Sequence, residues 1–398
     1  MIFLREGVPL VNQMIPFAAH TSEFAPLPFV RAEAAGLDPC KLERVCALVE
    51  EHIAAGVNPG AQLAVARNGK LVLDRVFGVA RLPPAEALTT SGTLFLTYSN
   101  TKVVTASAVW KLVEDGRLRF DDPAAAYLPS FEKHGKGGVT ILHLLTHQAG
   151  FPNAIVPLGL AEDHDALRAH LNEIELEWLP GENVHYHSAS AHWVLAMVIE
   201  AISGMDYRDF IQTAIIEPLG LGAEMALRIT QELSARCADM YAREGDGPLL
   251  PLALENSAAY RHAGRPGGGI HSTARAFAAF YQMILQKGRL GGTRLFSPRM
   301  IEYVTRNFTG ERINLMNGRP SHRALGPTVR GNTDFHPGHG AIAHPLTLGH
   351  AGMGSSYCWG DPDSGVSFAF VSNGRLDDEA HDRRMELLST VVHASIIS

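Results

Sequence analysis

Ser99 and Lys102 are the residues of this 398-residue chain whose types and spacing best suit covalent chemistry. A serine hydroxyl is a useful nucleophile only when a base lies within hydrogen-bonding reach. Three-residue spacing at the start of a helix places both side chains on one face of the first turn. The positive end of the helix favours alkoxide character on the serine, and burial moves a lysine toward its neutral, basic form. The pair therefore indicates a serine nucleophile with a lysine partner.

The run Ser99-Asn100-Thr101-Lys102 is weak evidence when it stands alone. Taken alone, it is better explained by a helix N-cap serine followed by a solvated first-turn lysine. The neighbouring residues must therefore decide between a catalytic pair and an ordinary helix start. Residues 99–114 carry an apolar stripe at helical spacing and end at Asp115-Gly116, which predicts a helix held in the core.

The two ends of the chain contain the strand signals that could build a sheet around this helix. Strand-like runs at 61–67 and 70–77 flank Asn68-Gly69, a tight-turn dipeptide. Strand character returns at 355–359 and 366–372, around turn residues at 361–365. Helices are predicted at 38–54 and 378–396. We expect one sheet assembled from both ends of the chain.

The middle third of the chain is rich in helix. Apolar periodicity and stop signals predict further helices at 143–147, 189–203 and 207–216, ending near Gly150, Gly204 and Pro218. This block is expected to be an insertion into the sheet-forming part.

Composition excludes several classes of protein. The chain is 46% hydrophobic and 19% charged, with a net charge of −7 and no basic run, so nucleic acid and anionic membrane surfaces are not expected partners. The four cysteines form no CxxC pair, and there is no run of about 18 apolar residues. The first twenty residues lack the pattern of a signal peptide. A cytoplasmic location is expected.

Five segments, in order, resemble landmarks of the serine β-lactamase and penicillin-binding protein superfamily. LFLTYSNTK (94–102) resembles its nucleophile region. The others are LLTHQAGFP (144–152) for "LLTHTSGLP", WLPGENVHYHS (178–188) for "PGxxFxYSN", GGGIHSTA (267–274) for "GGLxST" and GHAGMG (349–354) for "GHGGxGG". Within the superfamily the chain is most similar to class C β-lactamases and family VIII carboxylesterases.

This resemblance implies an α/β fold of the β-lactamase type, with an antiparallel sheet flanked by terminal helices and an inserted, mainly helical subdomain. An N-terminal arm is expected at 1–30. The α/β subdomain is expected to comprise 31–98 with 262–398, and the helical subdomain 99–261. The active site would lie at their junction.

The resemblance also assigns catalytic roles. It implies that Ser99 is the nucleophile, Lys102 its partner, and Tyr186 the residue that shuttles protons. Because a tyrosine beside a lysine ammonium has a lowered pKa, we expect the pKa of Tyr186 to be lowered.

The third motif and its neighbours supply the binding groups that the resemblance implies. Backbone N–H groups of Ser99 and Met353 are expected to form the oxyanion hole, beside Gly352. Ser188 stands where the superfamily has asparagine, and His350 stands where β-lactamases have lysine. A neutral histidine grips a carboxylate less firmly than a lysine does, so both changes favour neutral esters over β-lactams.

Sequence patterns for other kinds of functional site are incomplete or absent. The chain has 19 histidines, and His336, His339, His344 and His350 cluster in sequence, but no HExxH or comparable ligand spacing occurs. Neither G-x-S-x-G nor a nucleotide-binding GxGxxG after a strand is present. We therefore expect no metal and no cofactor.

The functional prediction is an esterase that forms an acyl-enzyme on Ser99 from a small-molecule ester. An acyltransferase that passes the acyl group to an alcohol or amine acceptor remains the alternative. Hydrolysis of β-lactams or D-peptide amides is less favoured, and a non-catalytic scaffold still less, because such relatives usually lose one of the three catalytic side chains. The oligomeric state is left open.

Overall fold

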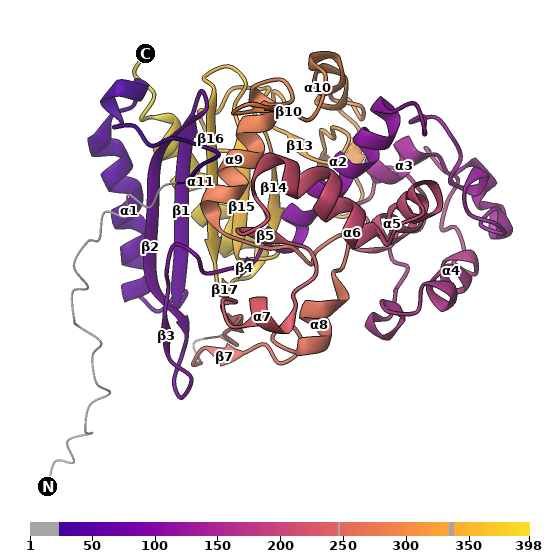
Figure 1. Ribbon diagram of the computed structural model, residues 1–398, viewed down its shortest axis with the longest axis horizontal. Helices are drawn as coiled ribbons and strands as arrows, with labels where there is room; N and C mark the ends of the chain where they lie inside the picture. The colour runs from indigo at the N-terminus through magenta and orange to yellow at the C-terminus, as the bar shows by residue number, and fades with distance from the viewer. Residues whose placement is uncertain (1–23, 246, 334–337) are drawn as a thin grey trace, which may run out of the picture.

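A seven-stranded antiparallel sheet joins the two ends of the chain (Figure 1). The computed structural model describes residues 24–245, 247–333 and 338–398. The strand order is β13-β14-β15-β16-β1-β2-β3. These strands are β13 (Thr328–Val329), β14 (Leu348–Gly352), β15 (Ser356–Gly360), β16 (Val366–Ser372), β1 (Gly60–Arg67), β2 (Lys70–Arg81) and β3 (Ala87–Leu88). Since β1 lies between β2 and β16, the predicted assembly from both ends is confirmed.

Side chains on β1 alternate between two apolar layers. Leu63 and Val65 face α1 (Pro39–Ala54) and α11 (Asp378–His393), which cover one side of the sheet. Ala64 faces the other side, where α9 (Ala274–Leu285) packs across the central strands. In the register Ala64 lies opposite Ala369 of β16, and two small side chains let the helix approach closely.

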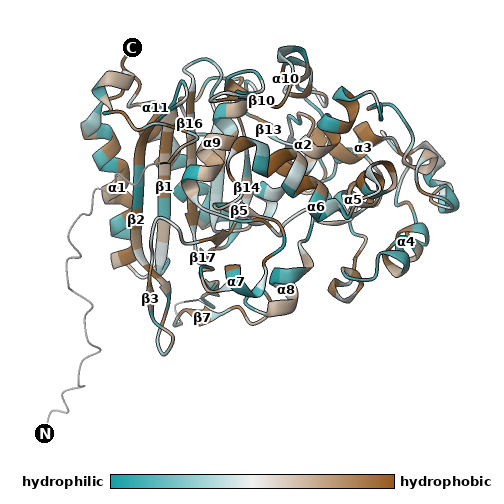
Figure 2. Cartoon of the chain, in the orientation of Figure 1, coloured by the Kyte–Doolittle hydropathy of each residue, from teal (hydrophilic) through white to brown (hydrophobic). Residues whose placement is uncertain are grey.

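The helical part contains a strongly apolar helix, α5 (Ser190–Ser203), which is buried over most of its length. It packs against α2 (Thr101–Glu114), α3 (Ile141–Leu145), α4 (His164–Asn172) and α6 (Tyr207–Ile211). Figure 2 shows hydrophobic residues concentrated in α5 and in the strands β1 and β2. A helix that is apolar on nearly every side is stable only when neighbouring helices bury it in this way.

Short elements complete the description. The remaining helices are α7 (Gln231–Ser234), α8 (Ala258–Ala263) and α10 (Pro298–Val304). The remaining strands are β4 (Phe95–Leu96), β5 (Met225–Ala226), β6 (Tyr241–Ala242), β7 (Leu250–Pro251), β8 (His271–Ser272), β9 (Arg289–Leu290), β10 (Thr293–Arg294), β11 (Ile313–Asn314), β12 (Arg319–Pro320) and β17 (Gly374–Arg375).

Several predicted boundaries move for local reasons. The helix predicted at 143–147 begins at Ile141 because Thr140 caps it, accepting from the backbone N–H of His143. The helix predicted at 207–216 ends at Ile211 and continues as a π-helical turn. Most of the predicted arm at 1–30, namely residues 1–23, lies outside the described residues. The backbone N–H of Val30, the last residue of that arm, donates to the carbonyl oxygen of Leu71. None of the described helices is both long and apolar enough to cross a bilayer.

Candidate active site

A 3-10 turn, Tyr98–Asn100, presents Ser99 ahead of α2. The turn is anchored before and after the serine. The backbone N–H of Thr97 donates to Ile270, and the Asn100 side chain donates to Ser356 Oγ at 3.0 Å. Tyr98 has a φ of 44°, an uncommon backbone conformation for a non-glycine residue. Ser99 itself is partly exposed between buried neighbours, so the serine is both fixed and accessible.

Lys102 is completely buried, and its amine has three neighbours. Its Nζ lies 3.0 Å from Ser99 Oγ, 2.8 Å from the carbonyl oxygen of Ser188 and 2.7 Å from that of Gly267. The expected proximity of Ser99 and Lys102 is therefore present. No carboxylate of the described residues forms an ion pair with this amine.

The environment of Lys102 favours its neutral form. Burial lowers the pKa of Lys102 well below its usual value, and the positive charges of Arg265 and Arg323 lower it further. A neutral amine has two N–H donors and one lone pair. The two carbonyl oxygens take the two donors, so the lone pair is left for the proton of Ser99 Oγ. This geometry can activate a serine nucleophile.

Tyr186 completes the group of three, because its hydroxyl bonds the side chain of Ser99. Its ring centroid lies 5.1 Å from Lys102 Nζ. The expected lowering of its pKa is wrong: burial raises the pKa of Tyr186, and this outweighs the opposing effects of Ser99 and Arg323. The phenol therefore keeps its proton and is a hydrogen-bond donor at neutral pH, whereas the environment of Lys102 favours the neutral, basic form of its amine.

A hairpin that no sequence motif marks holds Tyr186 in place. β11 and β12 form this hairpin, and Asn314 Oδ1 accepts from the backbone N–H of Tyr186 at 3.2 Å. The N–H of Leu315 donates to the carbonyl oxygen of Val184. His147, interpreted from sequence as a hydrogen-bonding residue at a helix end, accepts from the N–H of His187 through Nδ1 at 3.1 Å. The tyrosine segment is thus held from two sides.

The third motif lies on β14, next to the nucleophile turn. His350 is buried and stays neutral, because burial lowers its pKa well below the usual value. Its ring centroid lies 6.1 Å from that of Tyr186. Met353 follows the strand with its side chain exposed, and its backbone N–H bonds no described residue. Ser188 offers Lys102 its carbonyl oxygen, while its side chain is exposed.

Gly352 is required where β14 meets the nucleophile turn. A Cβ at this position would lie 2.2 Å from the carbonyl oxygen of Thr97 and 2.2 Å from Ser356 Oγ. We expect Gly352→Ala to push the strand away from Ser99 and to lower kcat by about 100-fold, the loss typical of removing an oxyanion donor. Steady-state kinetics measures this loss. Gly159→Ala is the control, because a Cβ there meets nothing within 4 Å; equal activity of the two variants would contradict the expectation.

Three residues near Lys102 were not identified from the sequence. Arg265 and Arg323 are the two cations that act on Lys102, and His192 is a buried neighbour of Lys102. None belongs to a motif that gives its residue type a role. Arg265 precedes the glycine run by one proline, and this adjacency was the available signal.

Two other groups of polar side chains resemble metal sites in composition. In the described part of the chain, His164, Glu200 and Asp206 converge closely enough to hold a metal ion. However, Arg168 pairs with Glu200, and Arg208 and Arg228 pair with Asp206. Of the sequence-clustered histidines, His336 lies outside the described residues, while His339 contacts Tyr357 and His350 lies at the active site.

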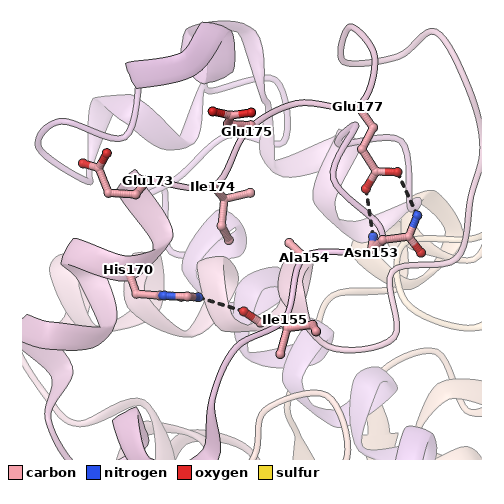
Figure 3. Close-up of a pocket in the computed structure, with 8 residues that line it drawn as sticks. All are labelled: Asn153, Ala154, Ile155, His170, Glu173, Ile174, Glu175 and Glu177. Carbon is pink, nitrogen blue, oxygen red and sulfur yellow. Dashed lines mark hydrogen bonds between the residues drawn. The ribbon is translucent and has the colours of Figure 1, made fainter.

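A surface hollow beside α4 is lined by glutamates, as Figure 3 shows. Glu173 pairs with Lys133, and Glu177 accepts from Asn153. His170 reaches the carbonyl oxygen of Ile155. These three side chains already bond other residues, and no nucleophile lies among the residues that line the hollow.

Comparisons with known proteins agree on the relationship. The model of the family described as Beta-lactamase matches residues 45–391. A protein named "Putative D-alanyl-D-alanine carboxypeptidase" from Salmonella agona is 25% identical over 390 residues, covering 89% of this chain and 88% of its own. A penicillin-binding protein homologue from Caulobacter crescentus has a TM-score of 0.76 and 26% identity, covering 90% of this chain and 99% of its own. A family VIII carboxylesterase, at 24% identity, has a TM-score of 0.77 and covers 90% and 98%; it shows a shared fold.

Proposed function

Because the chain belongs to the Beta-lactamase family, we propose that it is a serine hydrolase that cleaves carboxylic esters through an acyl-enzyme on Ser99. The observation that carries the proposal is the arrangement of Lys102. Its amine is buried with no carboxylate partner among the described residues, donates to two carbonyl oxygens, and lies 3.0 Å from Ser99 Oγ. A neutral amine held in this way is a base directed at one hydroxyl.

In the first half-reaction Ser99 Oγ gives its proton to Lys102 Nζ and bonds the ester carbonyl carbon. Negative charge develops on the carbonyl oxygen, and we assign its stabilisation to the backbone N–H groups of Ser99 and Met353. When the carbon–oxygen bond to the alcohol breaks, the leaving oxygen takes the phenol proton of Tyr186. The Lys102 ammonium, whose pKa is low, returns a proton to Tyr186.

In the second half-reaction water enters the position that the alcohol has left. It gives its proton to Tyr186 while the phenol passes its own proton to Lys102, and its oxygen bonds the acyl carbon. The bond to Ser99 Oγ then breaks and releases the acid, and Lys102 returns the proton to Ser99. An alcohol or amine in place of water would make the same site an acyltransferase. Nothing in the contacts of Ser99 favours one acceptor, so product mass with and without added alcohols separates the two outcomes.

The preference for esters over amides is supported by Ser188. Its backbone carbonyl bonds Lys102, but its side chain is exposed and shorter than an asparagine, so it supplies less to an amide group of a substrate. A matched panel of an aryl butyrate, the corresponding anilide, a β-lactam and a D-alanyl-D-alanine peptide tests this directly. Faster turnover of any amide than of the ester would overturn the ester assignment.

Covalent labelling tests the nucleophile independently of the substrate. We expect a fluorophosphonate probe to add to the folded protein and, after digestion, to be found on the peptide that contains Ser99. Loss of the adduct on denaturation is the control, because activation by Lys102 requires the fold. A folded protein without an adduct at Ser99 would refute the proposal.

Tyr186→Phe is expected to lower kcat by about 100-fold or more, the contribution of a positioned proton donor, with a smaller change in KM. The reason is that the ring and its packing remain while the phenol proton is lost. Steady-state kinetics on an activated aryl ester and on an alkyl ester measures it, and the alkyl ester, with the poorer leaving group, should lose more. Tyr303→Phe on α10 serves as the control. Equal losses for the two esters would contradict proton donation to the leaving oxygen.

A further inference from the structure

Arg384 is a buried cation beside the turn that joins β14 to β15. It lies on α11, is 4% exposed, and its guanidinium carbon lies 5.0 Å from the centroid of the Phe370 ring. Nη1 donates to Asn58 Oδ1 at 3.3 Å, and Nη2 bonds the carbonyl oxygen of Gly354 at 3.0 Å and His381 Nδ1 at 2.9 Å. No carboxylate of the described residues forms an ion pair with Arg384.

Three other buried arginines of this chain have a carboxylate partner. Arg208, Arg261 and Arg275 are buried to a degree similar to Arg384, and each of them binds at least one carboxylate. Burial lowers the pKa of Arg384 to about 9, which still leaves its guanidinium charged at neutral pH. A buried charge without a counter-ion costs free energy of folding, and proteins keep such departures chiefly at functional sites. The position of Arg384 therefore calls for a functional reason.

Arg384 reaches the nucleophile turn through a histidine. A guanidinium has no acceptor, so Nη2 donates to His381 Nδ1, and the neutral ring carries its proton on Nε2. Burial and the charge of Arg384 lower the pKa of His381 to about 3, so the ring stays neutral. Nε2 then donates to the carbonyl oxygen of Ser356 at 3.1 Å. Ser356 Oγ in turn bonds the Asn100 side chain at 3.0 Å and the carbonyl oxygen of Thr97 at 3.1 Å, on either side of the nucleophile.

The direct bond to Gly354 bears on the oxyanion hole. Gly354 follows Met353, whose backbone N–H the proposed reaction assigns to the oxyanion. It has a φ of 62°, within the turn 353–355. Its carbonyl oxygen accepts from the backbone N–H of Leu376 at 2.9 Å as well as from Arg384. Because these two donors fix the Gly354 carbonyl group, they also set the conformation of the turn and the direction of the Met353 N–H.

We propose that Arg384 is a positioning residue for the oxyanion hole, which holds the turn 353–355 from the α11 side so that the Met353 N–H points to the carbonyl oxygen of an ester bound at Ser99. This rests on the proposed function of Ser99. A donor that is held in place before the reaction stabilises the oxyanion without reorganisation. The benefit is greatest in the transition state, where the charge on the oxygen is largest, so loss of the positioning should lower kcat more than it raises KM.

A pair of substrates that differ in one atom reports on the oxyanion hole itself. An aryl ester is compared with the matching thionoester, in which sulfur replaces the carbonyl oxygen. Because sulfur is larger and a weaker hydrogen-bond acceptor, a well-positioned oxyanion hole favours the oxygen ester. A variant that is merely less well folded, or whose Ser99 is displaced, loses activity on both substrates alike. The ratio of kcat/KM for the two substrates therefore separates a positioning role from a structural one.

The experiment measures this ratio for the wild type, Arg384→Met, Arg384→Lys and Arg383→Met. We expect Arg384→Met to lower kcat on the oxygen ester by about 10- to 100-fold, the loss that follows when a catalytic group is misplaced rather than removed, and to lower the ratio by about 10-fold or more. Arg384→Lys should lower the ratio less, because an ammonium keeps the charge and a donor for Gly354. Arg383, the exposed neighbour on the same helix, should leave kcat and the ratio unchanged when replaced.

The relay through His381 has its own pair of variants. His381→Gln keeps an N–H donor for the carbonyl oxygen of Ser356 and should retain most of the ratio, whereas His381→Leu removes the donor and should lower it. If Arg384→Met does not fold, Arg384→Lys and this pair decide. An unchanged ratio in folded Arg384→Met would refute the positioning role and leave the esterase standing. A wild type that hydrolyses neither ester and takes no fluorophosphonate at Ser99 would refute the proposed function, and the positioning role with it.

Discussion

Replacing Ser99 by alanine is expected to abolish ester turnover, with a fall in kcat of at least about 10⁴-fold, while the melting temperature stays near that of the wild type. The proposed reaction forms its covalent bond at Ser99 Oγ, and no step can replace it. The fold should tolerate the change because Ser99 is partly exposed and Lys102 keeps its two carbonyl acceptors. Kinetics with an activated aryl ester and a thermal melt measure the two quantities.

The control for this variant is Ser203→Ala at the end of α5, which removes a hydroxyl far along the chain from the nucleophile turn. It should retain full turnover. Ser99→Ala should also lose the fluorophosphonate adduct entirely. Turnover above about one hundredth of the wild-type rate in a sample free of wild-type protein would show that another residue attacks the substrate.

Lys102→Met is expected to lower kcat by about 10³-fold or more, because it removes the base and keeps the volume of the side chain. In the wild type the reactive amine is neutral, so kcat/KM should rise with pH through the pKa of Lys102, which lies well below the usual value for lysine. The rising limb of the pH profile should be absent from the residual activity of the variant. Lys111→Met, on the exposed side of the same helix, is the matched control.

The buried amine also leaves a signature in stability. The folded-state pKa of Lys102 lies below its unfolded value, so between the two the unfolded chain binds one proton more than the folded chain. The free energy of unfolding therefore rises with pH across this window, and the folded state bears a penalty below it. Lys102→Met should flatten the dependence measured by denaturant unfolding between pH 7 and pH 9. An unchanged slope would contradict a neutral Lys102.

Much of the scaffold could be predicted from local signals. Asn68-Gly69 between two alternating runs indicated the hairpin of β1 and β2, and the apolar run before Gly204 indicated α5. The proximity of Ser99 and Lys102 followed from their spacing on one helix turn. Tyr186 was found through its neighbours, because a tyrosine alone carries no signal of catalysis.

What escaped prediction depends on contacts between distant segments. The carbonyl oxygens of Ser188 and Gly267 make Lys102 a directed base, but a backbone group has no signature in residue type. Arg323 lies far along the chain from Tyr186, and an arginine in a loop is ordinarily solvated. The expected direction of the Tyr186 pKa shift was wrong because burial dominates this shift. The burial of a side chain depends on the whole fold.

The pairing of β1 with β16 bears on how the protein matures during synthesis. The nucleophile turn depends on Ser356, 256 residues after Asn100, and the sheet closes only when β16 reaches β1. Such distant pairings form late, after the segment that carries β16 has left the ribosome. A nascent chain that already carries Ser99, Lys102 and Tyr186 should therefore be inert. Catalytic power should be acquired in one step, once β16 has been synthesised and has paired with β1.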